Sequence, residues 1–328
     1  MIEQTHQVEM EALMKEASEL LEAGKPELAL SIGRQMEKHR FSGGFEIQAL
    51  AYRELGDTEK AIQVLRQGTE CVPDVWVLWN LLGNYLSDEG SFDEALTAYD
   101  AGIDRPNIYT YCLRVNRANV VWRMKRLDEA DADIEALLSD TEFATADPDL
   151  KLYIHGARIG ILNDLGRHKE AITYFESLAD NQDWIHYPAE ASRIESKYAT
   201  ALWHDGRVDE ASSVVRRAVG LDKSNEDAQW LIREIRRQTG EIGSQSFELM
   251  IHGPWLSELS PECAGCKGFY SSYSVVAETL DEALAFVREF EPKEIRDALE
   301  IDEVKHQEPS DEPKGVYWTS GYSFYSED

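Results

Sequence analysis

The chain has 328 residues, 43% of them hydrophobic, and its 62 Asp and Glu outnumber 33 Lys and Arg to give a formal net charge of -29. This length accommodates two domains, and the hydrophobic share suffices for a buried core but is too low for a membrane protein. An acidic surface repels phosphate backbones and anionic lipid headgroups, so we expect neither a nucleic-acid nor a membrane partner. No apolar run reaches the roughly 18 residues that span a bilayer, and the amphipathic start is unlike a secretory signal, so we expect a cytoplasmic protein.

A helix-breaking Gly followed five residues later by an Ala recurs along the first two thirds of the chain. Gly can end the first helix of a pair at a positive φ, and the small Ala side chain lets the second helix approach closely. A recurrence of about 34 residues predicts helical hairpins that bury their apolar faces against one another. The pairs are Gly24 and Ala29, Gly56 and Ala61, Gly90 and Ala95, Gly166 and Ala171, and Gly206 and Ala211, while a sixth hairpin has Ala130 but Lys125 in place of the glycine.

The most regular pattern lies in residues 42–109, where two units follow one another. Trp79, Leu82 and Gly83 form W-x2-L-G, and Ala95 and Tyr99 follow at family spacing. This order resembles the tetratricopeptide repeat family. The resemblance covers residues 10–225 and implies a mainly α protein, a right-handed α-solenoid of about six helical hairpins.

Beyond the repeats, residues 226–238 predict one further helix that caps the open end of the solenoid, with Trp230, Leu231 and Ile235 on its apolar side. The longer connections at residues 141–149 and 181–188 are predicted to be loops.

The helical period stops at the Gly- and Ser-rich residues 239–246, which predicts a repeat domain over residues 1–240 and a second domain over residues 241–328. In the second domain two strand-like stretches precede an amphipathic helix, with Thr279 as its N-cap, and two more strand-like stretches follow. The order β-β-α-β-β predicts a small α+β domain. A domain of about 80 residues is close to the lower limit for independent stability, so we expect it to dock on the repeats.

Cys263 and Cys266 form a single C-x2-C in the second domain. Two thiolates at this spacing can bind zinc or form a redox pair, but a tetrahedral zinc site needs two more ligands. His252 and His306 are the only histidines in this domain. The favoured interpretation is a tight turn with two ordinary cysteines, and a metal site at Cys263 and Cys266 is the alternative. No cofactor is expected.

No catalytic motif stands out in the sequence. It has no P-loop, no G-x-G-x-x-G after a strand, no G-x-S-x-G and no H-E-x-x-H. The many carboxylates fall on solvated helix faces in the predicted pattern, so pairing any two as acid and base would be arbitrary. We therefore expect the protein not to be an enzyme.

The resemblance implies that the first helices of successive hairpins line a groove that binds a peptide. In the family, the residue after the small residue of such a helix often points into the groove, and here these residues are Asn84 and Asn119. An asparagine amide both donates and accepts, so it can bond the backbone of an extended peptide of any sequence. Polar residues that merely fill a narrow superhelix are the equally weighted alternative. Near the two asparagines in sequence are Asn80, Trp122 and Arg123.

Some family members hold a chaperone C-terminal carboxylate with a lysine, at positions where this chain has Glu46, Asn80 and Val115. We therefore do not expect a chaperone tail as the ligand.

Residues 105–127 hold six basic side chains and no acidic one, against the negative charge of the whole chain. Helical spacing is expected to place Arg114, Arg117 and Arg123 within reach of one broad face. One hypothesis is that they recognise a carboxylate or acidic motif on a protein or peptide partner, assisted by Asn84 and Asn119. The alternative is that they pair with acidic residues of the neighbouring hairpins.

Together these patterns predict a protein-interaction scaffold that binds its partner in the groove. Two alternatives from other classes remain. In the first, the cysteine pair of the C-terminal domain is a metal or redox module that the repeats position. In the second, the acidic protein neutralises a basic partner, as an antidote protein does.

Overall fold

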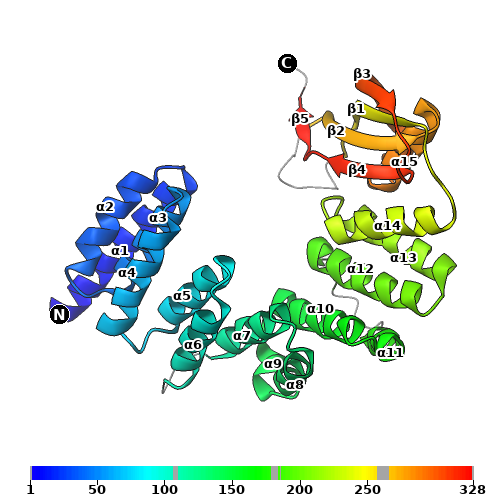
Figure 1. Cartoon of the computed structure of the whole chain (residues 1–328). Coiled ribbons are helices and arrows are strands. Elements are labelled where there is room, and N and C mark those ends of the chain that lie inside the picture. Colours follow the sequence, from blue (N-terminus) through cyan, green and yellow to red (C-terminus); the bar gives the residue numbers. More distant parts are fainter. Residues whose placement is uncertain (1, 106–109, 179–183, 185, 257–265, 327–328) are drawn as a thin grey trace. The chain divides into compact units, whose positions relative to one another are not determined.

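The computed structural model describes residues 2–105, 110–178, 184, 186–256 and 266–326. Its contacts divide the chain into two compact units, Met1–Thr145 and Ala146–Asp328. Helices α1 to α9 belong to the first unit, and α10 to α15 with the β-sheet belong to the second (Figure 1). In the part of the chain that the structure describes, no helix combines the length and apolarity needed to cross a membrane.

The first unit is a row of helical hairpins in which each helix from α1 to α7 packs against the next. The signature alanines Ala29, Ala61, Ala95 and Ala130 of the second helices are fully buried, which allows the close approach that their size predicted. The helices are α1 (Ile2–Glu22), α2 (Pro26–Glu37), α3 (Ser42–Glu54), α4 (Thr58–Cys71), α5 (Trp76–Asp88), α6 (Phe92–Ile103), α7 (Tyr111–Arg123), α8 (Leu127–Leu138) and the short α9 (Thr141–Thr145).

The turn between the two helices of a hairpin requires a left-handed residue. Gly24, Gly56 and Gly90 have φ values of 65°, 78° and 77°, which confirms the prediction from the sequence. In the hairpin of α7 and α8 this position is Lys125, with a φ of 59°. A side chain in this region costs roughly 1–2 kcal/mol because its Cβ approaches the following carbonyl oxygen.

Replacing Lys125 with Gly should therefore stabilise the first unit by about 1 kcal/mol. Lys125→Ala is the matched control, since it removes the long side chain but keeps the Cβ, and it should bring no such gain. Urea unfolding of the two variants checks this. Equal stability of the Gly and Ala variants would contradict the backbone explanation.

The second unit begins with further hairpins. Its helices are α10 (Pro148–Asp164), α11 (His168–Leu178), α12 (Pro188–His204), α13 (Val208–Leu221) and α14 (Glu226–Gln238). The predicted loop at residues 141–149 is wrong in part, because it contains α9 and the start of α10. Leu231 and Ile235 of α14 are buried as predicted, but Trp230 is 47% exposed, with its ring edge-on to Trp203.

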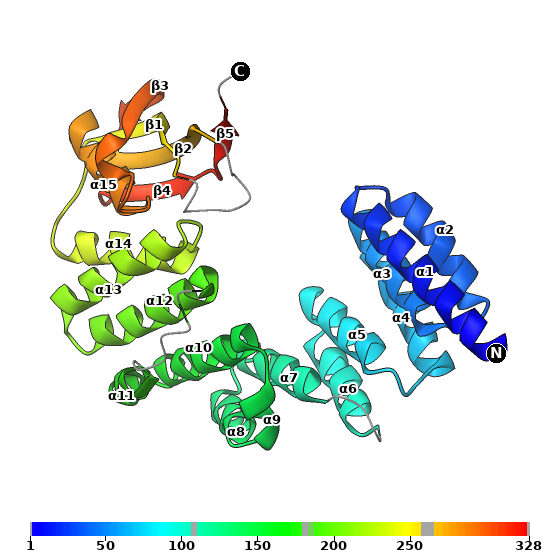
Figure 2. The same ribbon diagram turned by 180° about the vertical axis from the view of Figure 1, so that it is seen from behind.

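An antiparallel β-sheet follows α14, with the strand order β3-β1-β2-β4 (Figure 2). The predicted order β-β-α-β-β is confirmed, except that the last stretch forms two strands, both paired with β2. The break lies at Ser320, whose hydroxyl accepts from the backbone N–H of Ser272 at 2.9 Å. The elements are β1 (Gln245–Pro254), β2 (Gly268–Ala277), α15 (Leu280–Glu289), a 3₁₀ turn (Arg296–Ala298), β3 (Glu300–Pro309), β4 (Gly315–Thr319) and β5 (Ser323–Tyr325).

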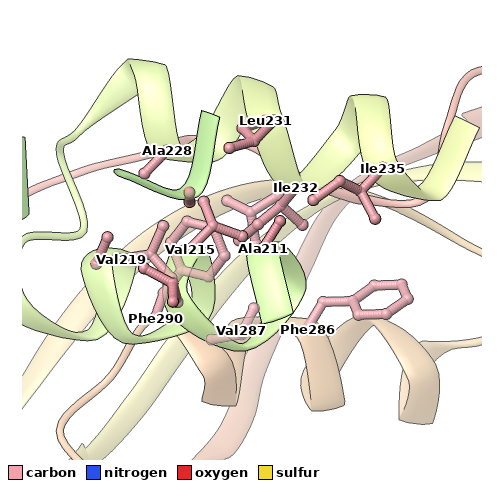
Figure 3. Close-up of a cluster of buried hydrophobic side chains, with 14 of the residues drawn as sticks. Ala211, Val215, Val219, Ala228, Leu231, Ile232, Ile235, Phe286, Val287 and Phe290 are labelled. Carbon is pink, nitrogen blue, oxygen red and sulfur yellow. The ribbon is translucent and has the colours of Figure 1, made fainter. Parts of the chain in front are cut away.

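The sheet docks on the last hairpins, as expected for so small a domain. Figure 3 shows apolar side chains of α13, α14 and α15 in one cluster, among them Val215, Ile232 and Phe286. Two arginines of α14 add polar contacts: Arg233 donates to the carbonyl of Val316 at 2.8 Å, and Arg236 pairs with Glu289 at 3.0 Å. The sheet therefore belongs to the same compact unit as the last hairpins, and the division between the two units, after Thr145, lies within the series of hairpins. The boundary predicted after residue 240 coincides with the change from hairpins to sheet, and as a domain boundary it remains a prediction.

His155 of α10 gives the second unit a pH-dependent stability. Its ring Nδ1 lies 2.7 Å from the hydroxyl of Tyr174, and burial lowers the pKa of His155 to about 4 from an ordinary 6.5. Below pH 6.5 the unfolded chain therefore gains a proton that the folded chain does not bind until about pH 4. Stability is lost as the pH falls through this window, by at most about 3 kcal/mol.

His155→Gln should remove this contribution, so the melting temperature of the variant should fall less steeply than that of the wild type between pH 6.5 and 4. Calorimetry at several pH values measures the difference in melting temperature between the variant and the wild type. The titration of all other groups is common to both proteins and cancels in this difference. Parallel curves would rule out the assignment to His155.

Candidate partner-binding site

A polar cavity of about 200 Å³ lies on the first helices of three successive hairpins in the first unit. Each of these helices places its polar residues near its C-terminal end, and residues four apart in a helix lie on the same face. The lining residues are Arg53 of α3, Asn84, Ser87 and Asp88 of α5, Tyr99 of α6, and Asn116, Asn119, Val120 and Arg123 of α7.

The amide of Asn84 is oriented by the hairpin itself. Gly83 has no side chain, so the ring of Tyr99 packs directly against its backbone. This places the Tyr99 hydroxyl where it donates to Oδ1 of Asn84 at 2.7 Å. With its oxygen engaged in this way, Asn84 keeps its two N–H groups for a ligand in the cavity.

The amide of Asn119 lines the same cavity from α7 and makes no hydrogen bond within the described residues. Three residues earlier on α7, Nδ2 of Asn116 donates to Oδ1 of Asn80 at 2.8 Å. Asn80 therefore links α5 to α7 and is not among the lining residues. The sequence patterns did not predict a role for Asn116, although its spacing from Asn119 places both near one face of α7.

Arg123 closes one side of the cavity. Its Nη1 donates to the hydroxyl of Ser87 at 2.6 Å, and its guanidinium lies 4.9 Å from the centre of the Phe92 ring. Among the described residues Arg123 has no carboxylate partner, so its charge is available to a ligand.

Arg53 lies on the opposite side, from α3, and its charge is matched by Asp88 at 2.9 Å. The sequence patterns did not predict a role for Arg53 either. A signal was present, because Arg53 precedes Ser87 by 34 residues and so occupies the equivalent repeat position.

Arg114 and Arg117 are not brought together with Arg123. Nine residues at about 100° per residue place Arg114 on the opposite side of α7 from Arg123. Arg114 pairs with Asp140 at 2.5 Å and lowers the pKa of that carboxyl by hydrogen bonding. Arg117 pairs with three carboxylates, Asp133 at 2.6 Å, Asp100 at 2.7 Å and Glu129 at 3.6 Å.

The two arginines line a separate cavity of about 70 Å³ against α8. For them the structure shows the internal pairing that was the alternative hypothesis, and their role in partner binding remains a prediction. Trp122 is half-buried and lines neither of these cavities, so its role also remains a prediction.

The helical hairpins and their sequence identify the repeat type. Residues 48–108 and 161–226 match the family model of the tetratricopeptide repeat. The chain contains tetratricopeptide repeats. Such repeats form a scaffold for protein interactions that is typically non-enzymatic. No curated protein matches the sequence.

Solved structures show the same fold. A tetratricopeptide repeat protein from Parabacteroides merdae is 16% identical, with 69% of this chain and 84% of that chain covered and a TM-score of 0.51. PilF of Pseudomonas aeruginosa is 15% identical, with 69% and 97% covered and a TM-score of 0.52. PilW, a type IV pilus biogenesis factor, is 16% identical, with 68% and 98% covered and a TM-score of 0.50. At these identities the similarity concerns the fold alone.

A second charged group without a partner lies on the tetratricopeptide helix α3, one repeat before Asn80. Glu46 is half-buried and forms neither a hydrogen bond nor an ion pair with the described residues, and burial raises the pKa of its carboxyl. The neighbouring Tyr85 hydroxyl is fully buried and also has no partner among them. Burial raises the pKa of Tyr85, and the guanidinium of Arg53, which lies 4.8 Å from the centre of its ring, opposes that rise.

The C-terminal domain contains the other candidate site. Cys263 lies outside the described residues, and Cys266 is a half-buried free thiol. His306 of β3 stands opposite Glu248 of β1, four residues along the strand from His252, so the backbones of the two histidines are about 14 Å apart. No group of three or more potential metal ligands occurs among the described residues. A metal or redox role for the cysteines remains a prediction.

Proposed function

We propose that the protein is an interaction scaffold that binds an extended segment of a protein partner across the cavity on α3, α5 and α7. The observation that supports this most directly is the amide of Asn119, which has no hydrogen-bond partner among the described residues and lies in the same cavity as the oriented amide of Asn84. Two amides on adjacent helices can bond the main chain of an extended peptide whatever its side chains.

The size and polarity of the cavity favour a peptide over a small organic ligand. Small-molecule sites are usually about 300–1,000 Å³ and mostly apolar. This cavity is about 200 Å³, and nearly all the side chains around it are polar. A peptide that lies across three helices needs only shallow polar contacts at each of them, with the rest of its surface in solvent.

Fewer cations are available to a partner than the sequence suggested. Asp88 already neutralises Arg53, and carboxylates of the first unit surround Arg114 and Arg117. Arg123 is the cation in the cavity that can take a carboxylate of the partner without breaking an existing ion pair among the described residues.

Replacing Asn119 with Ala tests this function. Peptides selected on the full chain from a randomised display library should bind the variant roughly 5- to 100-fold more weakly, because a truncated hydrogen-bond partner costs about 1–3 kcal/mol. The fold should be unaffected, since Asn119 bonds to none of the described residues.

Gln35→Ala is the matched control. Gln35 is an exposed amide on the second helix α2, away from the cavity, and its removal should leave affinity unchanged. Selected peptides that bind Asn119→Ala as tightly as the wild type would contradict the proposed function.

A further inference from the structure

Two charges of opposite sign, neither of which has a counter-ion among the described residues, lie on the first helices of the first unit. Glu46 is a half-buried carboxylate on α3, and Arg123 is a guanidinium on α7 without a carboxylate partner among the described residues. Two other arginines of the unit do have carboxylate partners: Arg66 pairs with Glu94, and Arg53 pairs with Asp88. A carboxylate partly removed from water without a counter-ion is destabilising, and a ligand cation would offset that cost.

The positions of these charges can be derived from helix geometry. Glu46 precedes Arg53 by seven residues, about 10 Å along α3. Arg53 is at the level of Arg123, because Arg53 contacts Asp88 and Arg123 contacts the adjacent Ser87. From α3 to α7 is two interhelical spacings of about 10 Å each. The diagonal from Glu46 to Arg123 is therefore about 22 Å, which an extended peptide spans in about seven residues.

Resting on the proposed function, we infer that this surface selects partner segments that carry both charges: a Lys or Arg beside Glu46, and an Asp, Glu or terminal carboxylate about seven residues away beside Arg123. The amides of Asn84 and Asn119 hold the main chain between these two ends. The amides supply affinity for any extended chain, whereas the two charges determine which chain binds and in which direction.

Exchanging the two charges tests the inference. The variant Glu46→Lys with Arg123→Glu and the wild-type chain are each used to select peptides from the same randomised display library. Whichever order of basic and acidic residues the wild type selects, the exchanged variant should select the reverse order. A purely structural role for either residue would not invert a preference.

The matched control exchanges two charges that lie outside the proposed binding surface. It is Glu70→Lys on α4 combined with Lys38→Glu, just after α2. Both residues are exposed, and the control should select the same peptides as the wild type. Glu46→Gln alone provides a milder variant. It should weaken binding of a selected peptide about tenfold, but have no effect when the basic residue of that peptide is replaced by Met.

The possible failures are distinguishable. Selected peptides that depend on Asn119 but show the same charge order with the wild type and the exchanged variant would overturn this inference and leave the proposed function intact. Selected peptides that are insensitive to Asn119→Ala would overturn both.

Discussion

Replacing Lys223 with Met should destabilise the second unit by about 3–5 kcal/mol, because it leaves a buried carboxylate without its counter-ion. Lys223 precedes α14, and its Nζ lies 3.1 Å from Oε1 of Glu291, which is fully buried beneath the sheet. The hydroxyls of Tyr273 and Tyr322 also donate to Glu291, the latter at 2.7 Å. These contacts join the last hairpin to the sheet, so their loss should lower the melting temperature of the unit by many degrees.

The double variant Lys223→Met with Glu291→Gln separates the buried charge from the packing. A neutral glutamine can still accept from one tyrosine with its oxygen and donate to the other with its NH2 group, so the double variant should be more stable than Lys223→Met alone. Arg66→Met is a surface control, since it breaks the exposed pair with Glu94 and should cost less than about 1 kcal/mol. If the stability losses of the two single substitutions simply add in the double variant, the unpaired buried charge is not the cause of the destabilisation.

Replacing Gly44 with Ala should destabilise the first unit by about 3 kcal/mol, the upper range for overpacking a helix contact. A Cβ at this position would lie 2.5 Å from the backbone nitrogen of Glu37 and 2.8 Å from the carbonyl oxygen of Gly33. Both atoms belong to the backbone of α2, so a side-chain rotation cannot relieve the clash, and α2 and α3 must separate.

Urea unfolding measures the loss as a lower midpoint. Gly321→Ala is the control, because a Cβ there meets no atom within 4 Å, and it should be neutral. An unchanged midpoint for Gly44→Ala would contradict the close contact of α2 and α3.

The fold was largely readable from the sequence because tetratricopeptide hairpins are built from local signals. The glycine at the turn determines where one helix ends, and the alanine five residues later determines how closely the next helix can pack. Lys125 shows that the position is set by the whole hairpin, since it adopts the same left-handed φ without being a glycine.

The site was predicted only in part. Asn84, Asn119 and Arg123 lie in one cavity, and helix position sufficed to name them. Arg114 and Arg117 were grouped with Arg123 because all three are cations on one helix. Their partner Asp133 lies in α8, the second helix of the same hairpin, and Asp140 follows the end of α8. Only the packing of the helices reveals such pairs.

Long-range contacts were beyond the sequence for the same reason. Lys223 and Glu291 are separated by 68 residues, and no periodicity links them. That Glu46 is half-buried without a counter-ion among the described residues is likewise a result of helix packing, which the sequence does not show.

The most direct test of the central claim is a nuclear magnetic resonance titration of the full chain with a selected peptide, observing side-chain amide signals. The signals of Asn84 and Asn119 should shift with a common saturation curve, while that of Gln35 should remain in place. If the peptide binds and the signals of Asn84 and Asn119 do not move, the partner binds elsewhere, which would contradict binding across the cavity on α3, α5 and α7.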